Sequence, residues 1–124
     1  MPEGRDAQAL ADIVAATQRV GTFLAGMDQA GFEQDERTQA AVLFQIVIIG
    51  EAAKRLSNEA RIAHPTVPWH QVTRMRDFVA HQYHKIDLEV LWNTASRSIP
   101  VLLQTLMTQA DISPGTRTRQ EEDA

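Results

Sequence analysis

The sequence has no cysteine, and none of its apolar runs is long enough to cross a membrane. Without cysteine, disulfide bridges, thiolate metal sites and cysteine nucleophiles are excluded. A membrane-spanning helix needs about 18 or more consecutive apolar residues, and no segment reaches that length. The first ten residues, MPEGRDAQAL, contain no apolar stretch of the kind that a signal peptide requires. We therefore expect a cytoplasmic protein without a membrane segment.

Internal repeats are also absent, and only one segment has the composition of a β-strand. Residues 40–49 are apolar except at Gln45 and are rich in β-branched side chains, which would suit a buried strand. Good helix formers flank this run, and no second strand candidate could pair with it, so we predict a helix over 37–57. A helix that is apolar nearly all round is buried on more than one side, at the centre of the domain or at a subunit interface. The sequence therefore favours a homodimer.

Four main helices account for the apolar periodicity of the chain. Apolar side chains recur at helical spacing over 7–25, 37–57, about 68–82, and from Leu88 onward. The 124 residues are 44% hydrophobic and 23% charged, which is ordinary for one globular domain. We predict an all-α, antiparallel helical bundle over residues 1–112, followed by a polar tail over 113–124.

The ends of these helices follow from capping chemistry. Pro100 falls inside the last helix, where its ring and its missing N–H are expected to produce a kink. Residues 26–36 and 83–86 are expected to be irregular connections. The expected boundary residues are Asp6 as N-cap and Gly26 as stop of the first helix, Pro68 as the first residue of the third helix, and Asp87 as N-cap of the last.

Positive charge is concentrated in one part of an acidic chain. The formal charge is −4, which argues against a nucleic-acid-binding surface that covers the whole protein. Residues 54–85 contain all four histidines, six basic residues and two acidic ones, a local charge of +4, so that the remainder carries −8. This segment is either a solvated helical face or a site for a phosphate-bearing partner. In the second case the phosphates would meet Lys54, Arg55, Arg61, Arg74 and Arg76, and binding would weaken with salt.

Three residues of this segment have the chemistry for RNA cleavage without a metal: Arg76, His81 and Tyr83. A neutral histidine can take the proton of a ribose 2′-hydroxyl or donate one to the leaving oxygen. An arginine can hold the scissile phosphate through two parallel hydrogen bonds and stabilise its growing charge. A tyrosine can bind a phosphate oxygen, and its ring can stack on a base. The triplet therefore predicts a candidate catalytic site.

Helical geometry restricts how these residues could meet. Residues five apart on a helix are separated by about 140° around the axis, and residues two apart by about 200°. Arg76, His81 and Tyr83 therefore converge only if the chain leaves helical geometry near His81. Asp77, four residues before His81, could fix the tautomer of the imidazole. Each motif holds a single catalytic histidine, so acid–base chemistry would be easier if two motifs faced each other across a dimer.

Each of these residues also has a structural interpretation. Arg76 could be a surface ion-pair partner, His81 a hydrogen-bonded structural histidine, and Tyr83 a half-buried packing residue. His81 and His84 are three residues apart and could touch one metal ion, but no carboxylate stands at a convincing spacing. We therefore expect neither a metal nor another cofactor.

The motif and its surroundings resemble the HEPN superfamily, and more specifically the HepT-like toxins of bacterial and archaeal MNT–HEPN toxin–antitoxin pairs. The spacing Arg-X4-His-X-Tyr matches the HEPN signature, and the resemblance extends from about residue 37 to 106. The supporting residues are the run GEAAKRLS from Gly50 to Ser57, the turn with Pro65, Val67, Pro68 and Trp69, the motif segments Met75-Arg76-Asp77 and His81-Gln82-Tyr83, and then Ile86, Asp87 and Trp92.

This resemblance implies a homodimer of small helical bundles in which the two motifs meet at a shared cleft. Several such proteins are metal-independent endoribonucleases. Carried over to this chain, Arg76 and His81 would be catalytic, and Tyr83 would line the cleft and contact RNA. Glu51 also matches a recurrent family position, with a role either in helix packing or near the cleft.

The resemblance also implies a regulatory partner. In such pairs, which are of the type VII kind, the antitoxin is a minimal nucleotidyltransferase that silences the toxin by attaching AMP to the motif tyrosine, here Tyr83. The added phosphate would repel RNA and block the cleft. Two alternatives stay open: a non-catalytic HEPN dimer that binds a nucleotidyltransferase, and a purely structural helical dimer.

Overall fold

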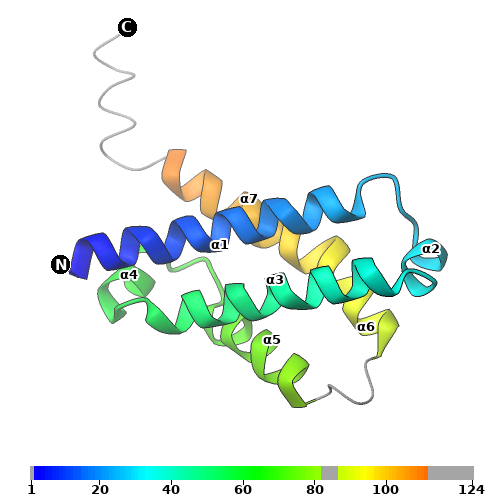
Figure 1. Cartoon of the computed structure of the whole chain (residues 1–124). Helices are drawn as coiled ribbons and strands as arrows, with labels where there is room; N and C mark the ends of the chain where they lie inside the picture. The colour runs from blue at the N-terminus through cyan, green and yellow to red at the C-terminus, as the bar shows by residue number, and fades with distance from the viewer. Residues whose placement is uncertain (1, 82–86, 112–124) are drawn as a thin grey trace, which may run out of the picture.

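The computed structural model describes the backbone over residues 2–81 and 87–111, and side chains over 4–75 and 87–108. Within these ranges the regular structure is entirely helical, so the expected all-α fold is confirmed (Figure 1). The elements are α1 (Pro2–Leu24), α2 (Gln29–Glu33), α3 (Glu36–Arg55), α4 (Asn58–Ala63), α5 (Trp69–His81), α6 (Leu88–Asn93), the π-helical turn η1 (Thr94–Ser98) and α7 (Ile99–Asp111). No helix among these is both long and apolar enough to cross a membrane.

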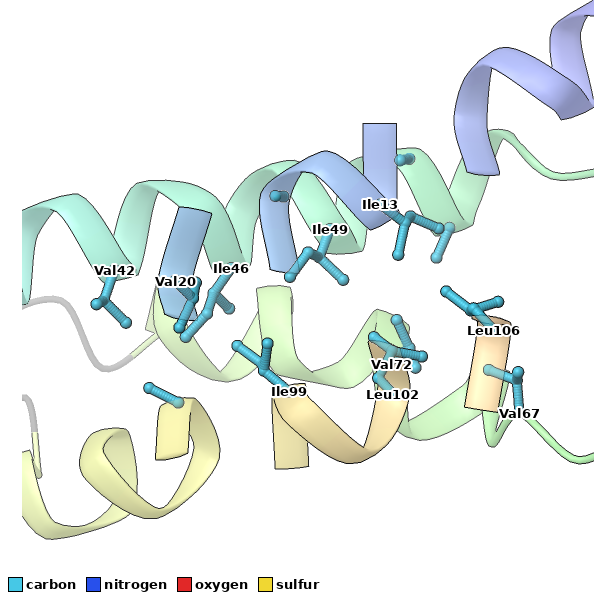
Figure 2. Packing of buried hydrophobic residues seen from close by; sticks show 14 of the residues in the cluster. Ile13, Val20, Val42, Ile46, Ile49, Val67, Val72, Ile99, Leu102 and Leu106 are labelled. Atoms are coloured by element: carbon cyan, nitrogen blue, oxygen red, sulfur yellow. The ribbon is translucent and has the colours of Figure 1, made fainter. Parts of the chain in front are cut away.

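The core lies where α1 and α3 pack side by side in opposite directions, with α5 against α3 and α7 against α1 (Figure 1). Most of the side chains that fill it are aliphatic, and all four of these helices contribute to them (Figure 2). Burying such side chains is the main stabilising contribution to a domain of this size. Those labelled in Figure 2 are Ile13, Val20, Val42, Ile46, Ile49, Val67, Val72, Ile99, Leu102 and Leu106.

Helix α3 is the central element of the bundle, as its nearly uniform apolar composition predicted. It packs against α1 on one side and α5 on the other, which confirms burial on more than one side. Its one polar residue in the apolar run, Gln45, is buried, and its side-chain oxygen accepts a hydrogen bond from Arg19 Nη1 at 3.4 Å. On the remaining face the side chain of Phe44 is 63% exposed.

The start of the first helix differs from the prediction. Helix α1 begins at Pro2, so Asp6 lies inside it and is not its N-cap. The Asp6 carboxylate instead accepts hydrogen bonds from the Ser57 backbone N–H at 2.9 Å and from Ser57 Oγ at 2.6 Å. The predicted stop is confirmed, because Gly26 follows the helix with a φ of +75°, a left-handed conformation that glycine adopts without strain.

Two short helices were missed. Helix α2 lies inside the predicted connector 26–36, capped by Asp28, and its Phe32 is buried with its ring centroid 5.5 Å from that of Trp92. Helix α4 is capped by Ser57. Both have six residues or fewer, which is too short for apolar periodicity to show in the sequence.

The later helices follow the prediction with local differences. Helix α5 begins at Trp69, one residue later than predicted. Pro68, predicted as the first helical residue, instead directly precedes the helix, and its carbonyl accepts the first hydrogen bond, from the Val72 N–H at 3.0 Å. Asp87 caps α6 as predicted: its Oδ1 accepts from the N–H groups of Glu89 and Val90 at 3.0 and 3.2 Å.

The last helical stretch contains a π turn that the sequence pattern did not indicate. In η1 the Ile99 N–H donates to the Thr94 carbonyl, five residues back. Pro100, for which a kink was predicted, directly follows Ile99 and has no N–H to donate to an earlier carbonyl. The helix is therefore irregular immediately before the proline. The predicted break at 83–86 and the predicted tail at 113–124 lie outside the described residues.

Candidate functional site

Helix α5 carries the predicted catalytic motif, and its first half is firmly anchored. Trp69 and Val72 are buried, with exposed fractions of 7% and 2%. The Trp69 indole N–H donates to the carbonyls of Arg61 and His64, at 3.3 and 3.1 Å. An indole that is both buried and hydrogen-bonded fixes the position of its helix. The backbone of Arg76 follows Val72 by one turn.

The two predicted catalytic residues lie on this one helix. The backbone is helical through His81, where α5 ends, so positions 76 and 81 are about 140° apart around the helix axis. A straight α5 therefore does not place them on one face of a single subunit. Asp77 is four residues before His81 in the same helix, the spacing at which two helical positions are neighbours. Tyr83 lies outside the described residues.

The predicted phosphate-binding residues come from three helices, with Arg61 on α4 and the others on α3 and α5. Lys54 and Arg55 stand in the last turn of α3, and Arg74 is exposed on α5. Cations in the last turn of a helix also stabilise it through the helix dipole. Glu51, whose side chain is half-buried, lies one turn before Lys54 and Arg55 on the same helix.

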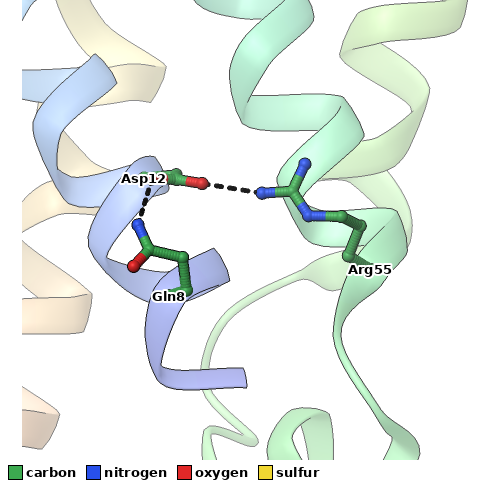
Figure 3. A network of polar contacts seen from close by, with 3 residues as sticks. All are labelled: Gln8, Asp12 and Arg55. Carbon is green, nitrogen blue, oxygen red and sulfur yellow. Dashed lines mark hydrogen bonds and ion pairs between the residues drawn. The ribbon is translucent and has the colours of Figure 1, made fainter. Parts of the chain in front are cut away.

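Two of the basic residues have protein partners that the sequence did not indicate. Arg55 Nη2 forms an ion pair with Asp12 Oδ2 at 2.7 Å, and Gln8 Nε2 donates to the other oxygen of the same carboxylate at 2.9 Å (Figure 3). Arg61 Nη2 donates to the Ala53 carbonyl at 2.8 Å, near the end of α3. Arg61 therefore joins α4 to α3, while Arg55 joins α3 to α1.

A pocket of about 400 Å³ opens between α5 and the stretch η1–α7, and sequence reasoning missed it. On the η1–α7 side the pocket is lined by three hydroxyl residues, Thr94, Ser98 and Thr105. Their spacing of four and seven residues is the one sequence signal that could have indicated a polar stripe on this helical stretch. The lining residues are Thr66, Pro68, Gln71, Val72, Met75, Thr94, Ser98, Val101, Leu102 and Thr105.

One carboxylate with altered surroundings, Asp6, lies away from the motif. Hydrogen bonds from the Ser57 hydroxyl and from the Ser57 backbone lower the pKa of Asp6 below its usual 3.8. Over the ranges that the structure describes, histidine, aspartate and glutamate do not gather in groups of three or more that could hold a metal ion.

An all-α bundle with an Arg-X4-His-X-Tyr motif beginning on one of its packed helices defines the class: a small helical domain of the HEPN type. The chain matches the model of the HepT-like family, described as ribonuclease HepT-like, over residues 13–108. This range contains every predicted catalytic residue and the pocket. The chain therefore belongs to the HepT-like ribonuclease family, as the sequence indicated.

Named relatives agree with this assignment. The chain is 39% identical over 93 residues to a probable ribonuclease HepT of Thermococcus cleftensis, a match that covers 75% of this chain and 84% of the relative. Two putative RNases of Methanocaldococcus jannaschii are each 34% identical to it, over 91 and 101 residues. These matches cover 73% and 81% of this chain and 75% and 86% of the relatives. No solved structure matches the chain.

Proposed function

We propose that this protein is a metal-independent endoribonuclease, with Arg76 and His81 as its catalytic residues and Tyr83 as an RNA contact. The observation that carries the proposal is the family match, which spans the whole motif from Arg76 to Tyr83. The anchoring of α5 through Trp69 and Val72 supports it, because a site on a fixed helix can hold its groups in a defined geometry.

The reaction needs two proton transfers and stabilisation of a phosphate. The ribose 2′-oxygen attacks the adjacent phosphorus as its proton passes to a neutral imidazole. The bond from phosphorus to the 5′-oxygen then breaks, and that oxygen takes a proton from a protonated imidazole, leaving a 2′,3′-cyclic phosphate and a 5′-hydroxyl. The Arg76 guanidinium would neutralise the charge that builds on the phosphate oxygens. Asp77 would hold the His81 ring in the required tautomer.

A homodimer would supply the second histidine that this two-step chemistry favours. Positions 76 and 81 lie on different sides of α5, which supports a cleft completed by a second subunit. The outer face of α3 provides an apolar contact surface, with Phe44 63% exposed and Val47 half-buried beside it. Glu51 lies one turn further along this outer face, and its carboxylate would support the site.

RNA cleavage in the presence of a chelator tests the proposal. We expect the wild-type protein to cut total RNA in EDTA, and His81→Ala and Arg76→Ala each to lower the rate by about 100-fold or more, the scale of general acid–base catalysis and of phosphate stabilisation. His70→Ala is the matched control, because His70 is exposed at the start of the same helix. Undiminished cleavage by a folded His81→Ala protein, or wild-type protein that is inert, would contradict the proposal and favour a non-catalytic binding dimer.

The motif tyrosine would also be the point of regulation. We propose that the protein acts in the cytoplasm as the toxin of a toxin–antitoxin pair, and that a minimal nucleotidyltransferase antitoxin transfers AMP to the Tyr83 hydroxyl. Because Tyr83 is the one tyrosine of the chain, the modified residue is easily mapped. Each AMP would add a phosphate, whose negative charge opposes RNA binding at the cleft.

Mass spectrometry of the protein produced with and without a minimal nucleotidyltransferase of the proposed kind tests this regulation. We expect a mass gain of one or more AMP units on the peptide that contains Tyr83, together with loss of RNA cleavage. Tyr83→Phe protein, which lacks only the acceptor hydroxyl, should gain no mass. A modification that maps to another residue would refute the assignment.

A further inference from the structure

The pocket between α5 and η1–α7 has an apolar floor and a neutral polar rim. Val72 of α5 and Leu102 of α7, both labelled in Figure 2, line the pocket and are buried, at 2% and 4% exposure, so they form its floor. Met75 of α5 lies beside them and is half-buried. The volume of the pocket, about 400 Å³, is in the range of small-molecule sites.

The rim of this pocket has hydrogen-bonding capacity that the protein leaves unused. The Thr105 hydroxyl donates to the Val101 carbonyl at 2.8 Å and is occupied. By contrast, the side chains of Gln71, Thr94 and Ser98 make no hydrogen bond with any other residue that the structure describes. Two of these three residues belong to the π turn η1, a type of helical irregularity that is frequent at functional sites.

The charge of the lining restricts what can bind. None of the ten lining residues is ionisable at neutral pH, so no side chain here would offset the charge of a phosphate. An apolar floor suits the face of a flat ring, and amide and hydroxyl groups at the rim can donate to or accept from polar atoms on its edge. Proteins bind unpaired nucleobases with this combination of apolar packing and edge hydrogen bonds.

The position of the pocket connects it with the motif. Met75 lines the pocket and directly precedes Arg76 on α5, so the pocket and the backbone position of the proposed phosphate-binding arginine are adjacent. We propose that the pocket is a base-recognition subsite that takes one unpaired nucleobase beside the cleaved bond. This inference rests on the proposed ribonuclease function and adds a determinant of sequence preference to it.

Binding of RNA that cannot be cleaved tests the subsite independently of catalysis. The probes are four fluorescent 2′-O-methyl hexanucleotides, each made of one base, and the measurement is fluorescence anisotropy with the full chain. We expect the wild-type protein to prefer one base by about fivefold, the scale of one neutral hydrogen bond with its packing. Ser98→Leu, which fills the rim, should reduce the affinity for the preferred base to that for the others.

Two controls separate filling of the pocket from a general disturbance of the helices. Thr108→Leu makes the same kind of change at an exposed position of α7 outside the pocket and should keep the base preference. Ser98→Ala and Ser96→Ala form a second pair, because the Ser96 hydroxyl donates to the Trp92 carbonyl at 2.6 Å and does not line the pocket. Only Ser98→Ala should weaken the preference.

The outcomes distinguish the subsite from the ribonuclease activity. Equal affinity for all four probes, or a preference that survives in Ser98→Leu, overturns the subsite even if the protein cleaves RNA. A preference lost in Ser98→Leu upholds it even if cleavage fails, in which case the proposed function alone falls. If Ser98→Leu weakens binding of the nucleotidyltransferase but leaves base preference intact, the pocket is a protein-docking site and the subsite is refuted.

Discussion

At the scale of single residues, the contacts that sequence reasoning could identify are those between near neighbours. Asp87 was predicted as a cap because its partners, Glu89 and Val90, are two and three residues away. Asp6 has the same chemistry, but it binds Ser57, 51 positions further along the chain. Nothing in the local pattern around Asp6 indicates that partner, because it is set by how α1 packs beside the turn after α3.

The Asp6–Ser57 contact predicts how stability depends on pH. The contact lowers the pKa of Asp6 in the folded protein, so its stabilising effect is complete above the usual carboxyl value of 3.8 and is lost as the pH falls through the lower folded value. We expect Asp6→Asn to have a lower Tm than the wild-type protein at pH 7, and the difference to shrink below about pH 4. Thermal unfolding followed by circular dichroism measures both.

The control for this experiment is Asp12→Asn, which removes an exposed surface ion pair with Arg55 and should change the Tm less. A Tm difference between Asp6→Asn and the wild-type protein that is constant from pH 7 down to pH 3 would contradict the assignment of the effect to the Asp6 carboxylate.

At the scale of elements, helix length decided what could be predicted. The long helices α1, α3, α5 and α7 show apolar periodicity over several turns, and all four lie within or close to predicted helices. Helix α1 nevertheless begins at Pro2 and not near residue 7, and α7 is only the last part of the helix predicted from Leu88 onward. Helix α2 has five residues and one buried anchor, Phe32, so no period is visible. The pocket was missed for another reason: it depends on how η1–α7 lies relative to α5, and no single segment encodes that relation.

The buried and the exposed face of α3 predict different losses of stability on mutation. Ile46 is 1% exposed in the middle of the core, and truncation there leaves a cavity between α3 and its neighbours. We expect Ile46→Ala to lower the free energy of unfolding by about 2–5 kcal/mol, measured by urea denaturation. Ala40→Gly, at an exposed position of the same helix, should cost only about 1 kcal/mol from helix propensity. Equal losses at the two positions would mean that α3 is not packed as described.

At the scale of the whole molecule, the sequence pointed correctly to a HepT-like helical bundle, whereas the assembly of subunits remains a proposal. Local composition shows that α3 has more apolar surface than one neighbouring helix can cover. Within the described subunit α1 and α5 cover most of that surface, and Phe44 stays 63% exposed. Sequence alone could not separate the part of α3 that faces the core from the part that stays exposed.

The exposed side chain of Phe44 makes the proposed dimer testable. Phe44→Glu places a charge on the outer face of α3, where burial against a second subunit would leave it without solvent. We expect the wild-type protein to sediment as a dimer and Phe44→Glu as a folded monomer with strongly reduced RNA cleavage, both measured at the same concentration. Glu36→Gln, a change of charge at the exposed start of α3, should leave the dimer intact. A dimer that persists in Phe44→Glu would place the interface elsewhere.

The two tryptophans of the chain stand on either side of the motif. Trp69 opens α5 with its indole hydrogen-bonded to two carbonyls, and Trp92 in α6 lies against Phe32. Replacing either one by phenylalanine leaves a single tryptophan, at the start of the motif helix or just after the motif, and its emission can be excited without that of Tyr83. The emission of each single-tryptophan protein would then report on the segment before the motif or on the segment after it when RNA or AMP is added, without an attached dye.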